Sequence, residues 1–475
     1  FIYSKESDPT TATDLAKRIL AKYDGKHDGF HIYTAGYATF SYAISNRISK
    51  DLALAESISI PVTFILLAFV FGGLIASAMP LVVGISAILG AFLALYLISL
   101  ATGVSIFALN LVTGMGLGLG IDYSLLMVNR FREELHHGKS VEDAVVNTVK
   151  TAGRTVFFSG VTVVITLAAL MFFPQMFLKS FGYGGVTVVA MAVLGALIPL
   201  PAILALLGHK IDKIVVRKSA ITPKEDGRWA QTARMVMKRP VAVVLIALII
   251  LGILAAPIKN AVFSQVDSRV MPESSSIAQA GLQTALRFPG QEGNPIEIVI
   301  PKASQQSAAI ETFKSALAAT PGIAHLGSSE LIGDTLRLTA VHTVSPRSPD
   351  GEKLINALRA LPAPQGTLIG GVAADYADSQ AGIARTLPWA LLWIGIGVLI
   401  LLFLFTGSII LPIKAVILNF MSLSATMGAI TWVFGSGHLK WLVGNFTVTG
   451  SLDTSMIVLI SVVAFGLSMD YELFL

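Results

Sequence analysis

Long apolar blocks separated by short polar segments dominate the pattern of the chain. A helix needs about 18 or more consecutive apolar residues to cross a bilayer. Nine blocks reach or approach this length, and they cover roughly residues 56–73, 76–100, 106–129, 154–173, 180–207, 241–257, 387–405, 408–434 and 453–475. The pattern therefore predicts an α-helical polytopic membrane protein.

The composition agrees with this pattern and excludes several classes of protein. Of the 475 residues, 54% are hydrophobic and 13% are charged, whereas a soluble domain carries about 25% charged residues. A soluble protein is therefore excluded. The chain has no cysteine, which rules out disulfides and thiolate metal sites. The net charge of +5 does not require nucleic acid, because membrane proteins gather Lys and Arg in their cytoplasmic loops.

One polar region, residues 258–386, is large enough to be a domain. Its segments alternate between strand-like and helix-like periodicity. In chain order we expect a strand at 294–301, a helix at 304–319, strands at 323–329 and 334–344, a helix at 350–361 capped by Ser348, and a strand at 367–371. The order β-α-β-β-α-β is that of an α+β ferredoxin-like domain.

The distribution of positive charge predicts which side of the membrane each loop occupies. The stretch 209–240 carries nine Lys and Arg residues, and 130–154 carries several more. The connections on the opposite side are nearly free of them. Since positively charged loops stay in the cytoplasm, residues 1–50 and the domain at 258–386 are expected on the outer side.

The chain also repeats itself, which is the most informative feature of the sequence. Residues 36–45 align with 371–380, each as a helix that leads into the membrane. The sharpest match pairs Gly-Leu-Gly-Ile-Asp-Tyr, which ends at Tyr123, with Gly-Leu-Ser-Met-Asp-Tyr, which ends at Tyr471. Two parallel halves, each an outer domain followed by membrane helices, describe a duplicated protein.

The repeat and the polarity pattern together divide the chain into parts. We expect the C-terminal part of a first outer domain, the five spans of the first half, a basic cytoplasmic linker, the helix that opens the second half, a second outer domain and three further spans, at residues 1–50, 51–208, 209–240, 241–257, 258–386 and 387–475, respectively. By this count, one helix and part of an outer domain precede residue 1, and two helices follow residue 475.

Asp122 and Asp470 are the residues that we expect to carry the chemistry. Each lies about 15 to 17 residues into its apolar segment, which at about 1.5 Å per residue is some 25 Å along the helix. An isolated carboxylate at this depth is costly to ionise, so it finds a partner or takes up a proton. Tyr123 and Tyr471 follow directly, and their hydroxyls can donate to the carboxylate or relay a proton to it. Two such pairs at equivalent positions predict one proton relay of four residues.

Small residues beside the first pair predict close packing of helices. Gly114 and Gly118, and likewise Gly116 and Gly120, are spaced four apart, which lets helices approach closely. Gly466 takes the corresponding place in the second half. The glycine run is not a phosphate-binding loop, because it lies in an apolar segment and lacks the Gly-Lys-Ser/Thr ending.

Other polar and aromatic residues are expected to have simpler roles. The charged residues that follow the first pair predict a solvated, paired cytoplasmic surface, with coupling to the relay as the alternative: Arg130, Arg132, Glu133 and Glu134. Four tryptophans near the presumed membrane surfaces are expected to be interfacial anchors, namely Trp389, Trp393, Trp432 and Trp441.

At the two Asp-Tyr motifs the sequence resembles the mycobacterial membrane protein large (MmpL) family, a branch of the resistance–nodulation–division (RND) superfamily. The matching stretches are 118–135 and 465–475, and Thr-Gly-Ser-Leu-Asp at 449–453 also looks like the family. The resemblance implies a twelve-helix RND transporter in a bacterial plasma membrane, with two periplasmic porter domains and energy from the proton gradient. The family's proton-relay positions correspond here to Asp122, Tyr123, Asp470 and Tyr471.

The resemblance also implies what the protein binds. Similar members move cell-envelope lipids, siderophores or lipophilic drugs, so the expected cargo is a lipid or another amphipathic small molecule. Protons are the coupling ion, and we expect no further cofactor and no metal. The expected partners are membrane lipids and accessory proteins of the cell envelope, and the protein is expected to work as a monomer or a homotrimer.

Other functions remain open from the residues alone. Two buried carboxylates could share a proton in an intramembrane aspartyl protease, but a protease does not need duplicated outer domains. A lipid or sterol sensor that does not transport, or an auxiliary factor in protein export, could have the same fold. In a purely structural role, the aspartates would only hold helices together. The duplicated Asp-Tyr pair favours proton-coupled transport over the protease, the sensor and the purely structural role, and therefore a protein that is not an enzyme. The export factor would differ in its polypeptide cargo, on which the sequence is nearly silent.

Overall fold

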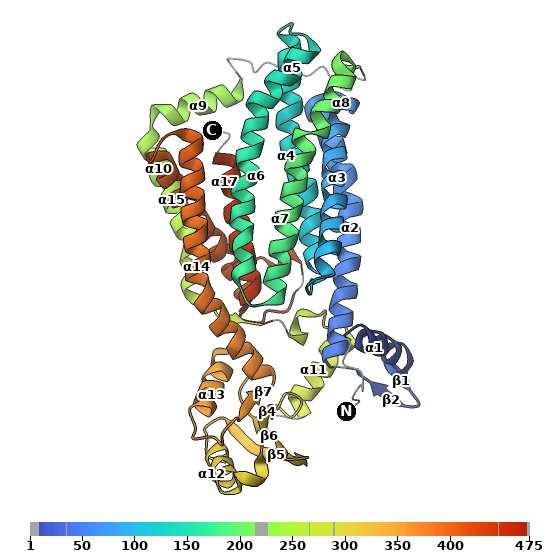
Figure 1. Ribbon diagram of the computed structural model, residues 1–475, viewed down its shortest axis with the longest axis vertical. Helices are drawn as coiled ribbons and strands as arrows, with labels where there is room; N and C mark the ends of the chain where they lie inside the picture. The colour runs from blue at the N-terminus through green and yellow to red at the C-terminus, as the bar shows by residue number, and fades with distance from the viewer. Residues whose placement is uncertain are drawn as a thin grey trace. The chain divides into compact units, whose positions relative to one another are not determined.

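The computed structural model describes residues 9–34, 36–213, 227–265, 267–287, 290–444 and 446–472 (Figure 1). The chain forms two compact units, and each is assembled from separate stretches of sequence. The first unit draws on 1–49, 260–384 and 430–456, and the second draws on 50–259, 385–429 and 457–475.

The second unit is built from long apolar helices that run alongside one another (Figure 1). Eight helical stretches of the described residues are long and apolar enough to cross a membrane. They cover Ala38–Phe71, Leu74–Ser99, Ala108–His136, Val141–Phe172, Met176–Asp212, Pro240–Asn260, Val372–Thr406 and Ile410–Gly435. A shorter apolar helix, Thr454–Met469, falls in the ninth predicted segment. The prediction of a multi-pass helical membrane protein is confirmed.

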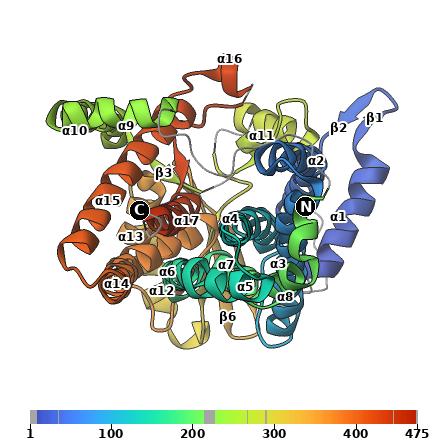
Figure 2. The ribbon, with the colours of Figure 1, turned by 90° about the horizontal axis from the view of Figure 1, so that it is seen from above.

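Twelve described α-helices lie wholly or mostly in this unit. They are α2 (Tyr37–Phe71), α3 (Leu74–Ser99), α4 (Ala108–His136), α5 (Val141–Thr148), α6 (Arg154–Ala168), α7 (Met176–Leu197), α8 (Pro199–Leu207), α9 (Arg228–Lys238), α10 (Pro240–Ala255), α14 (Val372–Thr406), α15 (Ile410–Ile430) and α17 (Thr454–Glu472). Seen from above, α4, α6 and α7 stand beside one another (Figure 2).

The two long helices α2 and α14 show the internal repeat at the level of the backbone. Each has 35 residues and joins the predicted leading helix to the predicted span without a break. Each follows a glycine with positive φ, Gly36 at 129° and Gly371 at 99°, and each is followed by another, Gly72 at 72° and Gly407 at 66°. Because L side chains rarely adopt such φ values, glycine is needed where these helices begin and end.

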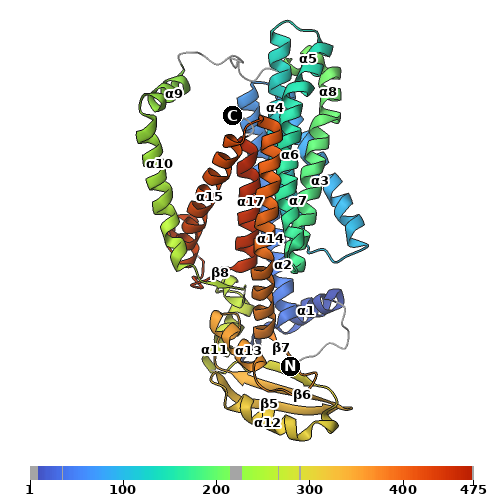
Figure 3. The same cartoon turned by 60° about the vertical axis from the view of Figure 1, so that its left-hand side comes forward.

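The strands of the described residues all belong to the first unit. Its elements are α1 (Pro9–Tyr23), β1 (Gly25–His27), β2 (Phe30–Ile32), β3 (Phe263–Ser264), α11 (Ser276–Arg287), β4 (Ile296–Ile300), α12 (Ser307–Ala318), β5 (Ile323–Ile332), β6 (Thr335–His342), α13 (Pro349–Arg359), β7 (Leu368–Gly370), α16 (Lys440–Val443) and β8 (Leu452–Asp453). Strands β5-β6-β4-β7 form an antiparallel sheet in that order, which Figure 3 shows beside α12. Along the chain, the sheet and its helices follow the order β-α-β-β-α-β.

The core of this sheet follows from the two-residue period of a strand. Ile296, Ile298 and Ile300 of β4 are fully buried, and they pack with apolar side chains of α12 and α13, among them Phe313 and Leu358. The alternate residues of β4 point to the opposite face. There Glu297 forms an ion pair with Arg337 of β6 at 2.9 Å. Ser348 caps α13 as predicted, since its Oγ accepts a hydrogen bond from the Gly351 amide at 3.3 Å.

Segments far apart in sequence meet elsewhere in the first unit. Strand β3 pairs in parallel with β8, so that Phe263 lies opposite Leu452. The Tyr376 hydroxyl donates to the Phe263 carbonyl at 3.0 Å, and Gln380 Nε2 donates to Thr454 Oγ1 at 2.9 Å. These contacts tie the start of α14 and the start of α17 to one place within this unit.

Candidate functional site

The first Asp-Tyr pair lies within α4, a helix apolar enough to span a membrane. Tyr123 is fully buried, and Asp122 beside it is half-buried. The α4 segment is also closely surrounded, because half of its most apolar window is buried inside the protein. An ionisable group therefore stands in the packed interior of the helix bundle, where a side chain of this kind is costly and commonly functional.

Helix α6 supplies a hydroxyl partner that the sequence analysis did not find. Ser159 Oγ donates a hydrogen bond to the Tyr123 hydroxyl at 3.3 Å, and Ser159 is fully buried. Thr162 and Thr166, further along α6, are also fully buried. Each of these threonines donates to the carbonyl four residues earlier, at 2.9 Å. The Ser-x-x-Thr-x-x-x-Thr spacing inside an apolar span is the signal that could have predicted this buried polar face.

The same helix touches α17, which carries the second Asp-Tyr pair. Gly466 lies against Thr166, and a Cβ added at Gly466 would come within 3.3 Å of the Thr166 Cβ. Asp470 and Tyr471 belong to the last turns of α17, but their side chains lie outside the described part of the structure. Helix α6 therefore contacts both helices that carry an Asp-Tyr pair. A direct contact between the two pairs stays a prediction.

The glycines predicted to allow close packing fall into two groups. A Cβ added at Gly120 would lie 2.4 Å from the Gly84 Cα of α3, and one added at Gly116 would lie 2.6 Å from Ile88 Cγ1. These two glycines let α3 and α4 cross almost backbone to backbone. For Gly114 and Gly118, no described atom lies within 4 Å of the added Cβ, so their role in packing stays a prediction.

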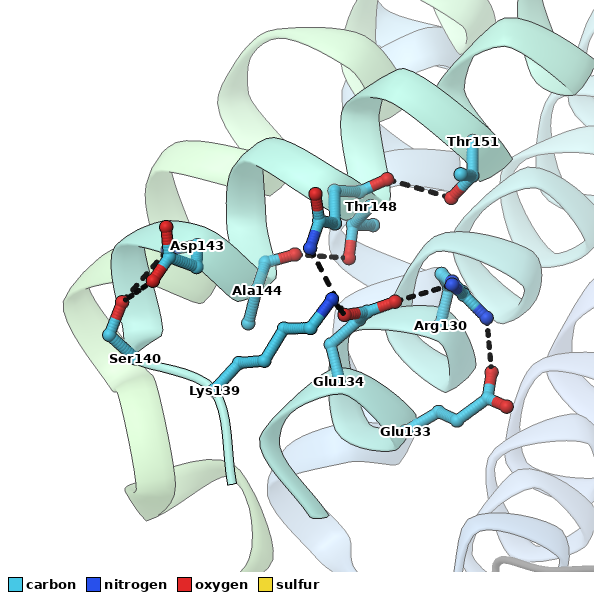
Figure 4. Close-up of polar contacts among 10 residues, drawn as sticks. Arg130, Glu133, Glu134, Lys139, Ser140, Asp143, Ala144, Thr148 and Thr151 are labelled. Carbon is cyan, nitrogen blue, oxygen red and sulfur yellow. Dashed lines mark hydrogen bonds and ion pairs between the residues drawn. The ribbon is translucent and has the colours of Figure 1, made fainter. Parts of the chain in front are cut away.

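A cluster of charged residues around the buried Glu134 lies at the C-terminal end of α4, next to α5 (Figure 4). Glu134 has a side chain only 3% exposed, and it accepts Arg130 on one carboxylate oxygen and Lys139 Nζ, at 2.6 Å, on the other. Asn147 Nδ2 of α5 donates to the same Glu134 oxygen as Lys139, at 3.2 Å. Arg130 also reaches the exposed Glu133 at 2.8 Å. Three polar partners, Arg130, Lys139 and Asn147, thus compensate the loss of hydration at Glu134.

A second ion pair is anchored on the same helix end. Arg132 Nη2 contacts Asp212 Oδ1 at 2.8 Å, with the Arg132 side chain 9% exposed, and its guanidinium lies 6.0 Å from the centre of the Phe71 ring. The expected pairing of charges after Asp122 is therefore confirmed. The expectation that they form a solvated surface is wrong for Arg132 and Glu134, which are buried. Arg132 is paired with the turn Gly208–Asp212 after α8, and Glu134 contacts Asn147 of α5.

The second unit also contains an apolar cavity between α10 and α15. Its volume is about 510 Å³. The lining is apolar apart from Ser424 and comprises Leu248, Leu251, Gly252, Ala255, Val416, Ile417, Phe420, Met421 and Ser424. Such a lining suits a hydrocarbon chain and offers almost nothing to a charged headgroup.

Comparison with known proteins decides the family. Residues 4–243, about half of the chain, match the MMPL family. The chain belongs to the MMPL family. The putative membrane protein SCO6666 of Streptomyces coelicolor is 36% identical over 99% of this chain and 65% of that protein. The trehalose monomycolate exporter MmpL3 of Mycobacterium tuberculosis is 33% identical over 94% of this chain and 52% of MmpL3.

Two further comparisons complete the picture of this MMPL chain. The mycolic acid-containing lipids exporter MmpL11 of Mycolicibacterium smegmatis is 30% identical over 98% of this chain and 51% of MmpL11. The chain thus spans between about half and two thirds of these relatives. The solved structure of SecDF, a translocon-associated membrane protein from Thermus thermophilus, covers 83% of this chain and 51% of SecDF, with a TM-score of 0.39 and 13% identity. That score is too low to carry a conclusion about fold or function.

The metal-ligating residue types of this MMPL chain do not gather into a site among the described residues. No three His, Asp or Glu side chains of that part lie close enough together to hold a metal ion. One tryptophan has a role beyond the predicted anchoring: Trp393 Nε1 donates to the Ile165 carbonyl at 2.9 Å and so joins α14 to α6. Among the described residues, α4 and α6 each carry three buried polar side chains, and others lie on α3, α5, α7 and α15.

Proposed function

We propose that this MMPL protein is an RND transporter driven by the proton-motive force, and that it exports a cell-envelope lipid or another amphipathic molecule across a bacterial plasma membrane. The observation that carries the proposal is the half-buried Asp122 beside the fully buried Tyr123 in an apolar span, with Ser159 bonded to the tyrosine. The printed functions of MmpL3 and MmpL11, which are lipid exporters, support the cargo class.

The proposed relay consists of Asp122, Tyr123, Asp470 and Tyr471. Protonation from the outer side neutralises the carboxyl groups, which weakens their mutual repulsion and their hydrogen bonds to tyrosine. Helices α4 and α17 then shift against α6, and release of the protons to the cytoplasm resets them. Each charge that moves through about 100 mV yields about 2.3 kcal/mol, so a few protons per cycle suffice for uphill export.

The strand order β5-β6-β4-β7 and the β-α-β-β-α-β order along the chain support a ferredoxin-like domain. We assign this domain, with the described part of residues 1–50, to the periplasmic side as a porter domain. The basic linker at 209–240 supports this orientation, because positively charged loops stay in the cytoplasm. The apolar cavity between α10 and α15 is a suitable place for the acyl part of a cargo within the membrane.

Export by cells that express the full-length protein tests the proposal. A fluorescent lipid analogue is followed in wild type, Asp122→Asn and Asp470→Asn, with and without an uncoupler. Both variants should reach the membrane in normal amounts and lose nearly all export, as the wild type does with uncoupler. Glu133→Gln, which changes an exposed carboxylate on the same helix, is the matched control and should export normally.

Each alternative makes a different prediction in the same experiment. If both variants export the lipid as well as the wild type does, the Asp-Tyr pairs are structural and the relay is wrong. If no tested lipid is exported even by the wild type, but the protein binds lipid and the uncoupler changes nothing, a sensor replaces the transporter.

A further inference from the structure

The first turns of α14 are firmly joined to the sheet of the first unit. Ala373, Ala374 and Ala377 belong to the buried core that this sheet forms with its helices. Next to them, Asp378 accepts two hydrogen bonds from the Arg359 guanidinium of α13, at 2.6 and 2.9 Å. Because a closely packed core transmits displacement, a force on this part of α14 moves the sheet with it.

Gln380 connects these turns of α14 to the start of α17, the helix that carries the second Asp-Tyr pair. Gln380 Nε2 donates to the hydroxyl of Thr454, the first residue of α17, at 2.9 Å. The Thr454 hydroxyl has one proton to donate. Two acceptors lie within reach, the Ser264 carbonyl at 3.2 Å and Gln380 Oε1 at 3.3 Å. The hydroxyl is therefore bonded to Gln380 whichever acceptor it uses.

Strand pairing holds the surroundings of this contact in place. Ser264 of β3 is buried and lies opposite Asp453 of β8. Asp453 directly precedes α17, and its carboxylate accepts a hydrogen bond from the Met456 amide at 2.8 Å, as a helix cap does. The Tyr376 hydroxyl, bonded to the Phe263 carbonyl, is a second link between α14 and β3. A shift of the first turn of α17 must therefore displace its partners on β3 and α14.

The first half of the repeat lacks the side chains for this contact. Gln380 aligns with Ser45, which has no amide to donate. Thr454 lies 16 residues before the aspartate of its half, and the residue at the same distance before Asp122 is Ile106. An isoleucine side chain neither donates nor accepts a hydrogen bond, and Ile106 is largely exposed. At these aligned positions, only the second half can form the bond between the two helices.

We propose that Gln380 and Thr454 are positioning residues of the transport cycle, and that they pass the movement of α17 to the sheet of the first unit in the second half alone. A proton taken up at Asp470 shifts α17, and Thr454 moves as part of the same helix. Gln380 transmits this displacement to α14 and so to the sheet. Energetic coupling is carried by hydrogen-bonded networks with two arrangements, and the two acceptors of the Thr454 hydroxyl provide them. The inference rests on the proposed function, because it requires that Asp470 drives α17.

Two measurements on the full-length protein separate coupling from folding. Export of the fluorescent lipid analogue is followed in cells, and proton flux is followed in vesicles that contain the purified protein and a pH-sensitive dye. Thr454→Val and Gln380→Leu remove the contact with little change in volume, whereas Thr454→Ser keeps the hydroxyl. Ser45→Ala and Ile106→Val are the matched controls at the aligned positions of the first half.

Thr454→Val and Gln380→Leu should each lower export about ten-fold and keep at least about half of the proton flux, since coupling between two sites is commonly of this size and Asp470 still exchanges protons. The double variant should export no less than either single variant, because all three lose the same contact. Thr454→Ser and both controls should export as the wild type does.

Normal export by Thr454→Val or Gln380→Leu would overturn the proposal. A parallel loss of export and proton flux, or a loss of export in Thr454→Ser, would also overturn it, because the contact then serves folding alone. An equal loss in the controls would overturn the assignment to the second half. Asp470→Asn reports separately on the proposed function. If Asp470→Asn abolishes export while Thr454→Val exports normally, only the present inference fails, and if Asp470→Asn exports normally, the relay itself fails.

Discussion

At the scale of single residues, hydroxyl groups decide how the site around Tyr123 is held. Two fully buried serines lie near this tyrosine: Ser124 follows it in the sequence, and Ser159 contacts it from α6. Ser159 bonds to Tyr123, whereas Ser124 Oγ has no hydrogen-bond partner among the described residues. Replacing these two serines by alanine should therefore have opposite effects on stability.

Ser159→Ala should lower the free energy of unfolding by about 1 kcal/mol, because the buried Tyr123 hydroxyl loses a partner. Ser124→Ala should change it little or raise it, because an unpaired buried hydroxyl is removed. Thermal unfolding of the full-length protein in detergent measures both. In the background of Tyr123→Phe, the cost of Ser159→Ala should shrink, and an unchanged cost would show that the serine acts elsewhere.

A second prediction concerns pH and the buried His342 of the first unit. Burial lowers the pKa of His342 below its ordinary value of 6.5, although the carbonyls of Asn294 and Val344, at 3.1 and 2.9 Å from its ring nitrogens, favour the charged form. The folded state thus binds the proton less readily than the unfolded chain does. Stability from this group is complete above about pH 6.5 and is lost as the pH falls below that value.

Melting temperatures between pH 7.5 and 5.5 test this effect. The wild type should lose thermal stability over this range through His342, and His342→Gln should lose less. His325→Gln, which changes an exposed histidine of β5, should keep the slope of the wild type. The assignment fails if His342→Gln has an unchanged slope.

At the scale of elements, the crossing of α3 and α4 depends on glycine at one position of each helix. A Cβ added at Gly120 would lie 2.4 Å from the Gly84 Cα, which is too close for two carbon atoms, so a side chain there must push the two helices apart. Three residues after Gly120, Tyr123 of α4 contacts Ser159 of α6. The distance between α3 and α4 therefore matters for the site as well as for stability.

Gly120→Ala should therefore destabilise the protein by about 3 kcal/mol, which is at the upper end for an overpacked core. Gly118→Ala is the matched control, because no described atom approaches its Cβ position and alanine favours a helix by up to about 1 kcal/mol. Thermal unfolding and the yield of monodisperse protein report the difference. Equal behaviour of the two variants would contradict the close crossing.

At the scale of the whole molecule, the distribution of charge between loops predicts the orientation. The turn between α4 and α5, with the Glu134 cluster, and the basic linker should face the cytoplasm. The sheet of the first unit should then face the outside.

Cysteine labelling in intact cells checks this prediction. A membrane-impermeant maleimide should label Ser329→Cys, in the exposed part of β5, without disruption of the cell. His137→Cys, in the exposed turn before α5, should react only after permeabilisation. The opposite pattern would invert the topology and place the proton-release side outside.

The apolar blocks and the repeat could be predicted from sequence because they depend on local properties. Hydropathy decides which segments enter a membrane, and glycines such as Gly36 and Gly371 mark helix starts through their own backbone conformation. Asp122 also stands out locally, since a carboxylate in an apolar block is costly wherever the block packs.

Only the tertiary structure decided which helices meet and which charged residues are buried. Ser159 is 36 residues from its partner Tyr123, and Asp212 is 80 residues from Arg132, so no local pattern relates them. Glu134 and Arg132 looked solvated because their sequence is polar, but both are buried, against α5 and the turn Gly208–Asp212 respectively. Burial depends on what packs from elsewhere in the chain, whereas hydropathy and helix ends depend on neighbouring residues.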